Sequence, residues 1–370
     1  MTWRVAALVL MLAGSANAQA DSAVRRTRQP WTRAVGDTAA LLYRGLDYGS
    51  DAYVSPFTVV LNKGFDIFQL RNHPRDIWTF PYGNSWRHSI VEAFTRPGPA
   101  IEHFGWKRFV RIELLPLGWS VEEGNWFANY AEHLVGGGLT MRMLDEWNRA
   151  HGVPFPRATA MLTTYIASIF NEITETRNLS GPTAGGVADL VVFDVAAIAL
   201  FHWDQPTRFF ARTLQAADWS NQASFTFPNK QLQNNGQYMT LKIPVGLGRN
   251  RFFVRGGLGA QLGVTRALDS ENSLSVGVGG DTEVRHVDER GHETIEFVPS
   301  AGVYYDRNNS LLWSLTMSHM ENFLTVNIYP GGVRRIPRDL GLWAVYTRHN
   351  EVRLGITHRR ALGLGVGYGR

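Results

Sequence analysis

Three residues in the middle of the chain carry side chains that could do chemistry together: His133, Glu172 and Asp189. Each lies in an otherwise apolar stretch, where an unpaired charge is costly to bury. A histidine oriented by a carboxylate is the general unit of acid–base catalysis, so His133 would be the base and an acid would orient it. These three are therefore the candidate catalytic residues. The supporting polar residues in the same stretches are Glu132, Asn171 and Glu175.

The same residues allow two other interpretations. They could form a polar lock, in which His133 bonds to one acid, Asn171 and Thr174 complete the network, and the network only fixes helix packing. One histidine with two or three acids could instead hold a divalent metal. The sequence has neither an HExxH motif nor a G-x-S-x-G elbow, so it assigns no metal site and predicts no cofactor. The polar lock is the simplest of the three interpretations.

Three predicted helices must position these side chains, and they cover Asn125–Ala150, Arg157–Arg177 and Gly185–His202. Gly136–Gly138 follow His133, and each glycine costs about 1 kcal/mol relative to alanine inside a helix. We therefore expect another helix to cross there at close range. Short loops make three successive helices antiparallel neighbours. His133, early in its helix, should then meet Glu172, late in the second, and Asp189, early in the third.

The third of these helices is almost wholly apolar over Val187–Phe201, where only Asp189 and Asp194 interrupt it. A helix over that run would rise about 22 Å, less than the ~30 Å of a bilayer's hydrocarbon core. The sequence therefore predicts a helix buried in protein and not a transmembrane span.

From Ser220 onward, apolar residues alternate with polar or small ones, as in Ser273–Val278 and Glu351–Thr357. This alternation predicts strands with one apolar face. Behind an export signal, it favours a barrel whose apolar face contacts lipid. The expected fold class is mixed, with an N-terminal helical module and a C-terminal antiparallel transmembrane β-barrel of about ten strands. Nine strands are counted, Arg251–Ala267 among them, and Ser224–Pro228 supplies the tenth because bacterial barrels have even numbers.

The expected organisation begins with a signal peptide over residues 1–18, because Arg4, an apolar run and the small residues Ala16-Asn-Ala18 form a cleavage signal. It continues with a mobile leader (19–35), an aromatic and proline-rich wrapping segment (36–124), the helical module (125–219) and the barrel (220–370). The chain has no cysteine, which excludes a lipoprotein anchor, disulfides and thiol chemistry. The net charge of +5 is scattered, so nucleic acid is not an expected partner.

The runs NYAEHLVGGGLTMRMLDEW, FNEITE and GPTAGGVADLVVFDVAAIALF, followed by alternating strands, resemble a family of uncharacterised exported bacterial proteins. The resemblance is clearest over Asn125–Phe201. It implies a histidine and small residues on one helix, an acid on the next, an aspartate opening a third apolar helix, and a terminal outer-membrane barrel. It implies no activity.

The expected partner is outer-membrane lipid or lipopolysaccharide. Arg334, Arg335 and Arg338 share one predicted loop, where guanidinium groups could bind lipid phosphates. Two functions stay open. The first is an outer-membrane barrel of structural or envelope-associated role, with helices bracing or plugging it. The second is a membrane-embedded hydrolase or modifying enzyme acting on lipid or lipopolysaccharide.

Overall fold

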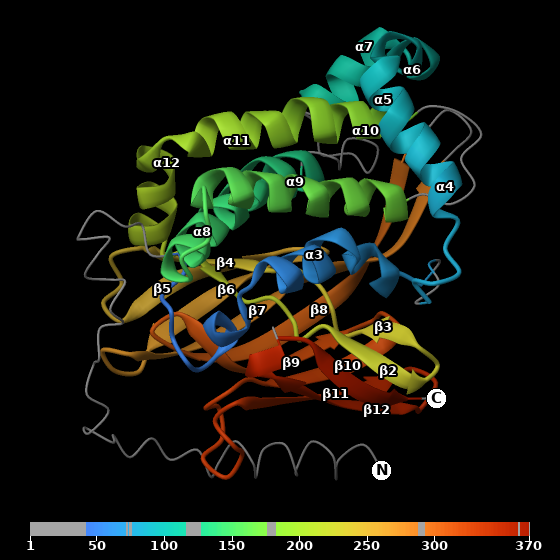
Figure 1. Cartoon of the computed structure of the whole chain (residues 1–370). Helices are drawn as coiled ribbons and strands as arrows, with labels where there is room; N and C mark the ends of the chain where they lie inside the picture. Colours follow the sequence, from blue (N-terminus) through green and yellow to red (C-terminus); the bar gives the residue numbers. More distant parts are fainter. Residues whose placement is uncertain are drawn as a thin grey trace.

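A helical part lies above a large, mostly antiparallel sheet in the computed structural model (Figure 1). The structure describes residues 42–71, 73, 76–115, 127–175, 183–287, 293–361 and 363–369. The predicted signal peptide and leader lie outside these residues. The coarse prediction of helices followed by a sheet is thus confirmed, whereas the closed ten-stranded barrel is wrong for the reasons given below.

The first elements lie between the sheet and the other helices (Figure 1), and they are η2 (Ser50–Tyr53), α3 (Pro56–Gly64) and η3 (Asp66–Gln69). The Tyr53 hydroxyl donates to the carbonyl of Thr357 in the sheet at 3.0 Å. On the opposite side, a Cβ at Gly64 would lie 2.9 Å from that of Phe170. Because Gly64 has no side chain, α3 can lie this close to the helix above it. This segment therefore joins the two layers.

The next helical stretch consists of α4 (Tyr82–Ser85), η4 (Trp86–Val91), α5 (Glu92–Thr95), α6 (Pro97–Phe104), α7 (Trp106–Phe109) and η5 (Val110–Leu114). The main helical module follows as η7 (Phe127–Gly136), α8 (Gly137–Ala150), α9 (Pro156–Glu175), α10 (Ala184–Gly186), η8 (Val187–Phe193), α11 (Asp194–His202), α12 (Asp204–Arg208) and η9 (Phe209–Thr213). Here η7 and η8 are π-helical and run directly into α8 and α11. All three predicted helices are confirmed over their described residues.

The stretch Ala184–His202 is long and apolar enough to cross a membrane by length and composition alone. About half of it (56 %) is buried inside the protein. Its inner side packs on α8, where Phe201 is fully buried, whereas Val195 and Leu200 are exposed. We therefore describe it as a helix of the module with one uncovered side.

The sheet has thirteen strands among the described residues, in the order β1-β4-β5-β6-β7-β8-β9-β10-β11-β12-β13-β2-β3. The first are β1 (Ala217–Asp218), β2 (Ser224–Pro228), β3 (Gln231–Gln233), β4 (Met239–Pro244), β5 (Asn250–Gly256), β6 (Gly259–Ala267) and β7 (Asn272–Val287). The others are β8 (Glu293–Arg307), β9 (Ser310–Ser318), β10 (Asn322–Ile328), β11 (Leu340–Thr347), β12 (Val352–His358) and β13 (Gly365–Gly369). From β4 to β13, each strand pairs with its neighbour in the chain.

Four features of the predicted barrel are wrong. Arg251–Ala267 forms two strands, because the chain turns at Gly257 and Leu258 between β5 and β6. The short strands β1 and β3 were not predicted. Moreover, β2 pairs with β13 in parallel, so the sheet is not wholly antiparallel. Among the described residues no strand pairing joins β1 to β3, and the sheet is therefore not closed into a barrel.

The two ends of the sheet are nevertheless bridged by one continuous segment, Ala217–Pro228, which we call the seam. Its first half follows β4: Ala217 pairs with Thr240, and the Trp219 and Asn221 amides donate to the Tyr238 and Gly236 carbonyls. Its second half follows β13, where Ser224 to Pro228 pair with Gly365 to Gly369. The seam thus hydrogen-bonds to the first long strand of the sheet and then to the last.

The polarity of the sheet is inverted relative to a soluble fold. In β12, Val352, Leu354 and Ile356 are about half exposed, whereas Arg353 and Thr357 are buried. The same alternation occurs in β6, where Leu262 and Val264 are exposed and Gln261 and Thr265 are buried. In these two strands the apolar side chains therefore point outward and the polar ones point inward.

Candidate functional site

The three candidate residues meet inside the helical module. His133 comes from η7, Glu172 from the end of α9, and Asp189 from η8. One nitrogen of His133 and one oxygen of each acid all lie within 4.8 Å of one another, and all three residues are buried. The prediction that they meet at one end of three antiparallel helices is confirmed. We call them the His–acid cluster.

A fourth residue, Asp194, also contacts the histidine. The Nδ1 atom of His133 lies 3.2 Å from the Oδ1 atom of Asp194, and Asp194 is only 4 % exposed. Burial raises the pKa of Asp194, but the charge and the hydrogen bond of His133 outweigh it and bring the pKa below its ordinary value. The Asp194 carboxylate is thus placed to accept a hydrogen bond from the His133 ring and to orient it.

The sequence did not single out Asp194, and the reason lies in the local helix geometry. In a π-helix the backbone bonds run from residue i to residue i+5, so residues five apart lie closer to one face than they would in an α-helix. Asp189 lies inside the π-helical η8 and Asp194 directly follows it, which lets both reach His133. The sequence predicts an α-helix here, with 3.6 residues per turn. In such a helix Asp189 and Asp194 would point in clearly different directions.

The glycines beside His133 do let another helix approach, as predicted. A Cβ at Gly138 would lie 2.1 Å from the Cδ2 atom of Phe201 in α11. A Cβ at Gly137 would lie 3.6 Å from the Oδ1 atom of Asp194. The approach of α11 is therefore closer at Gly138 than at Gly137. The absence of a side chain at Gly138 allows α11 to lie near His133.

The predicted supporting residues do not all join the cluster. Asn171 was expected to complete the network, but its amide donates to the Lys63 carbonyl at 3.2 Å and to the Asp66 carboxylate at 2.9 Å. Thr174 likewise donates to a backbone carbonyl of α3. The side chains of Asn171 and Thr174 therefore hydrogen-bond to α3 and η3, because they lie on the side of α9 that faces α3 and not on the side that faces η8. Glu132 is half-buried and Glu175 is buried, and neither belongs to the three converging donors.

The arrangement can serve each of the three roles predicted from the residue types. It can lock the helices together, it can move a proton through an imidazole oriented by Asp194, and it can supply one nitrogen and two oxygens to a metal. His133 is 5 % exposed, so a substrate in bulk solvent does not reach it directly. This burial favours a role in holding the module together or in binding a small ion.

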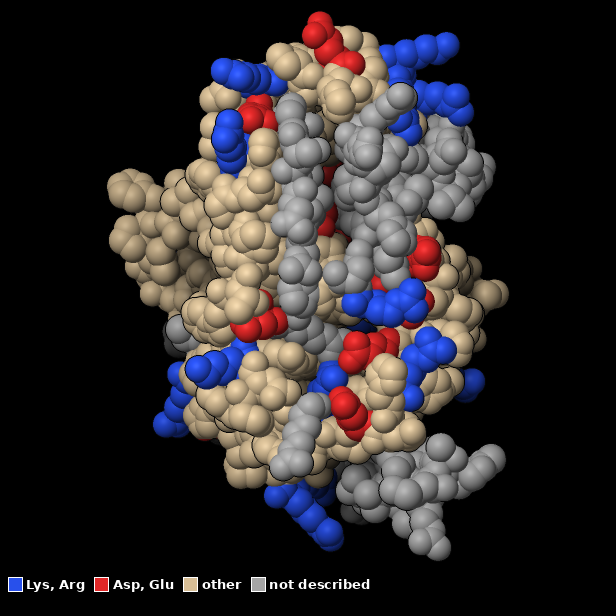
Figure 2. All heavy atoms as spheres, turned by 90° about the vertical axis from the view of Figure 1, so that its right-hand side faces the viewer, with Lys and Arg blue, Asp and Glu red and all other residues tan. Residues whose placement is uncertain are grey.

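The predicted lipid-binding arginines lie elsewhere. Arg334, Arg335 and Arg338 are exposed in the loop between β10 and β11. On the face shown in Figure 2, basic and acidic side chains are interspersed with uncharged surface.

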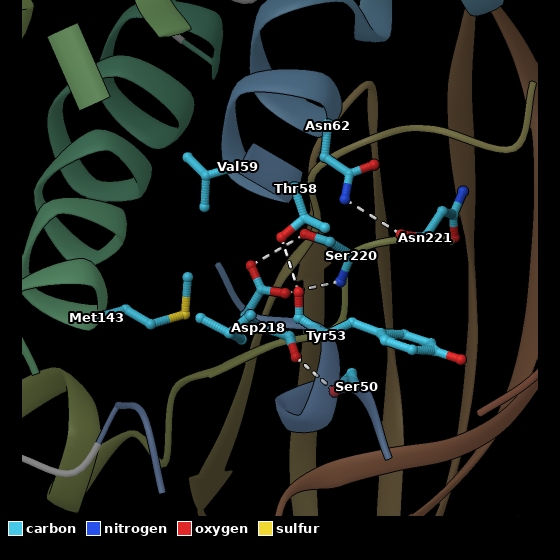
Figure 3. A pocket seen from close by; sticks show the side chains of 10 residues that line it. Ser50, Tyr53, Thr58, Val59, Asn62, Met143, Asp218, Ser220 and Asn221 are labelled. Carbon is cyan, nitrogen blue, oxygen red and sulfur yellow. Dashed lines mark hydrogen bonds between the residues drawn. The ribbon is translucent and has the colours of Figure 1, made fainter. Parts of the chain in front are cut away.

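A small cavity lies between α3, α8 and the seam (Figure 3). Its volume is about 20 Å³, which is room for a single water molecule. Ser220 and Ser50 bind the Asp218 carboxylate and carbonyl, respectively, and Asn62 donates to the Asn221 carbonyl at 3.1 Å. The Asn62 bond fastens α3 to the seam, and the Ser50 bond fastens η2 to it. The cavity is too small for an organic ligand.

Comparison with known protein families, with curated proteins and with solved structures finds no match for this chain. The function must therefore be argued from the sheet and from the His–acid cluster.

Proposed function

We propose that the protein is a structural component of the bacterial outer membrane, with the outward face of its sheet against lipid and its helices bracing the inward face. The single observation behind this proposal is the inverted polarity of the sheet. A sheet in water hides its apolar face, whereas membrane-embedded sheets turn it outward.

The exposed apolar face extends over most of the sheet. Its exposed large residues are Phe227, Phe252, Leu262, Val264, Val276, Val278, Phe297, Met317, Val352, Leu354, Ile356, Val366 and Tyr368. Complete burial of a large apolar side chain contributes about 1.5–3 kcal/mol. These side chains are 39–64 % exposed, so contact with lipid adds roughly half of that value for each of them. In water this face would forgo a large part of the free energy that normally stabilises a domain, and contact with lipid recovers it.

The inward face carries charged and polar side chains, several of which pair with one another within the protein. Lys242 and Asp306 form an ion pair at 2.6 Å with no exposure of either side chain, and Asn309 also accepts from Lys242 at 2.9 Å. Beside them, the Tyr304 hydroxyl donates to Gln261 at 2.6 Å. Charged groups inside a sheet and aliphatic groups outside are the opposite of a water-soluble core.

Aromatic side chains and the first segment occupy the inward side. Tyr53 from η2 packs with Trp219, Phe253, Tyr304 and Tyr329 in one buried cluster. Further up, α3 separates the sheet from α9 (Figure 1). Such a filled interior supports a bracing role more than an open pore.

The seam removes the main objection to placing an unclosed sheet in a membrane. Unpaired backbone N–H and C=O groups are not tolerated in contact with hydrocarbon. The seam supplies hydrogen-bond partners to β4 on one side and to β13 on the other. The two strands that would otherwise be sheet edges are thus largely satisfied.

A charge on the outward face tests the proposal. Val278 is among the most exposed aliphatic residues of the sheet. Val278→Arg should lower stability by about 2–4 kcal/mol if this site is near the middle of a bilayer, and Val278→Leu should be neutral. The amount of folded, heat-modifiable protein in the outer-membrane fraction measures both. Recovery of the wild type from the soluble periplasm, together with a neutral Val278→Arg, would refute the proposal.

A second function, a membrane-embedded enzyme acting on lipid or lipopolysaccharide, is favoured by the His133–Asp194 pair. A strain carrying His133→Ala should then lose a lipid modification that the wild-type gene restores, at an unchanged level of folded protein. Unchanged envelope lipids combined with reduced stability would instead favour the bracing role.

A further inference from the structure

We propose that the His–acid cluster binds one divalent transition-metal ion, with His133, Glu172 and Asp189 as ligands and Asp194 as the residue that orients His133. The proposal goes beyond the envelope role and does not depend on it.

The geometry of the donors is the first argument. Three donors from three separate helical elements lie within 4.8 Å of one another. Ligands about 2.0–2.2 Å from a common metal lie roughly 3–4 Å apart. Small side-chain rotations bring the three atoms to that spacing, without any movement of the helices.

The types of donor indicate which metals fit. One imidazole nitrogen and two carboxylate oxygens suit Zn²⁺, Mn²⁺ or Fe²⁺. Calcium prefers six to eight oxygen ligands and is a poorer match. A divalent ion also balances the two negative charges that Glu172 and Asp189 carry as ligands.

Asp194 is positioned like the carboxylates that hydrogen-bond to a metal-bound histidine without binding the metal themselves. A histidine that ligates a metal usually donates its other ring N–H to a carboxylate, which fixes the tautomer and raises the basicity of the ligand. In this chain Nδ1 of His133 faces Asp194 at 3.2 Å. The Nε2 atom is therefore assigned to the metal.

Two glycines leave room around these carboxylates. A Cβ at Gly186 would lie 3.5 Å from the Oε2 atom of Glu172 and 2.7 Å from the carbonyl oxygen of Ser89. A Cβ at Gly137 would lie 3.6 Å from Asp194. Larger residues at these points would restrict the rotations that metal binding requires.

Cobalt is the probe for the test, because its visible absorption reports the ligands directly. The full chain is purified without a histidine tag, stripped with a chelator and titrated with Co²⁺. We expect one equivalent to bind with an absorption typical of nitrogen and oxygen ligands, and Zn²⁺ or Mn²⁺ to displace it. Bound metal is counted independently by mass spectrometry.

Isosteric variants assign the ligands. Glu172→Gln and Asp189→Asn should each weaken binding at least tenfold, and Asp194→Asn should weaken it by about 10–100-fold through His133. Glu146→Gln is the matched control, because Glu146 is a buried acid of the same module that accepts from the Tyr43 amide. It should bind Co²⁺ like the wild type.

The outcomes separate this proposal from a polar lock. The absence of a one-to-one Co²⁺ complex in the stripped wild type would overturn it, and this measurement needs no variant to fold. Equal affinity in the wild type, Glu172→Gln and Asp189→Asn, with folding verified by circular dichroism, would also overturn it. The Co²⁺ titration does not depend on whether the protein fractionates with the outer membrane. Failure of the membrane proposal and failure of the metal proposal are therefore distinguished by separate measurements.

Discussion

Two adjacent glycines of α8 should respond to alanine in opposite directions. At Gly137 the new Cβ would meet its neighbours at 3.6–3.9 Å, which is ordinary van der Waals contact. Gly137→Ala should therefore gain the helix propensity of alanine, about 0.5–1 kcal/mol. At Gly138 the Cβ would lie 2.1 Å from Phe201, whose ring is fully buried and packs on Phe210. Overpacking of this kind costs about 1–3 kcal/mol.

The net expectation for Gly138→Ala is a loss of up to about 2 kcal/mol, because the propensity gain offsets part of the overpacking. Equilibrium unfolding in urea, followed by tryptophan fluorescence, measures both variants against the wild type. Combining Gly138→Ala with Phe201→Leu should recover part of the loss, because the smaller side chain frees the space. If Gly138→Ala were as stable as Gly137→Ala, the close crossing of α8 and α11 would be refuted.

Three further predictions concern other parts of the fold. Lys242→Met should cost about 3–5 kcal/mol in urea unfolding because Asp306 stays buried without its ion-pair partner, and adding Asp306→Leu should restore most of it. Burial raises the pKa of Asp66 to about 7, so the folded protein binds a proton that the unfolded chain loses above pH 3.8. Stability should therefore fall as the pH rises from 3.8 to about 7, and Asp66→Asn should flatten this dependence in pH-resolved thermal melts. A cysteine at Arg335, in the longer type of loop that faces the cell exterior, should react with an impermeant reagent on intact cells; protection there with labelling at Asn350 would invert the topology.

The helices and their meeting point could be predicted because both depend on local patterns. Apolar spacing gives the length of each helix, and short loops give its direction. These two facts place His133, Glu172 and Asp189 together. The partner of His133 could not be predicted in the same way, since Asp194 reaches it through a π-helical turn that the side-chain pattern does not reveal.

The sheet was predictable strand by strand but not as a whole. Alternation identifies which residues face outward, and the polarity of β6 and β12 follows it. A Gly256–Gly257 pair inside one apparent strand was the available signal for the turn before β6. The pairing of β2 with β13 joins residues that are far apart in the chain, and no local pattern specifies such a partner.

The seam has a consequence for the order of folding. Ser224 pairs with Gln233 of β3 on one side and with Gly365 of β13 on the other. The second half of the seam can therefore pair with β3 early, but its bonds to β13 form only when the last strand of the chain has been made. Contacts between such distant residues form slowly, because a long loop must close before they contribute. The long strands β4 to β12 can pair with their neighbours in sequence as the chain lengthens. We therefore expect β13 to pair last. A chain that ends before β13 would form most of the sheet but would leave the edges of β12 and β2 unpaired.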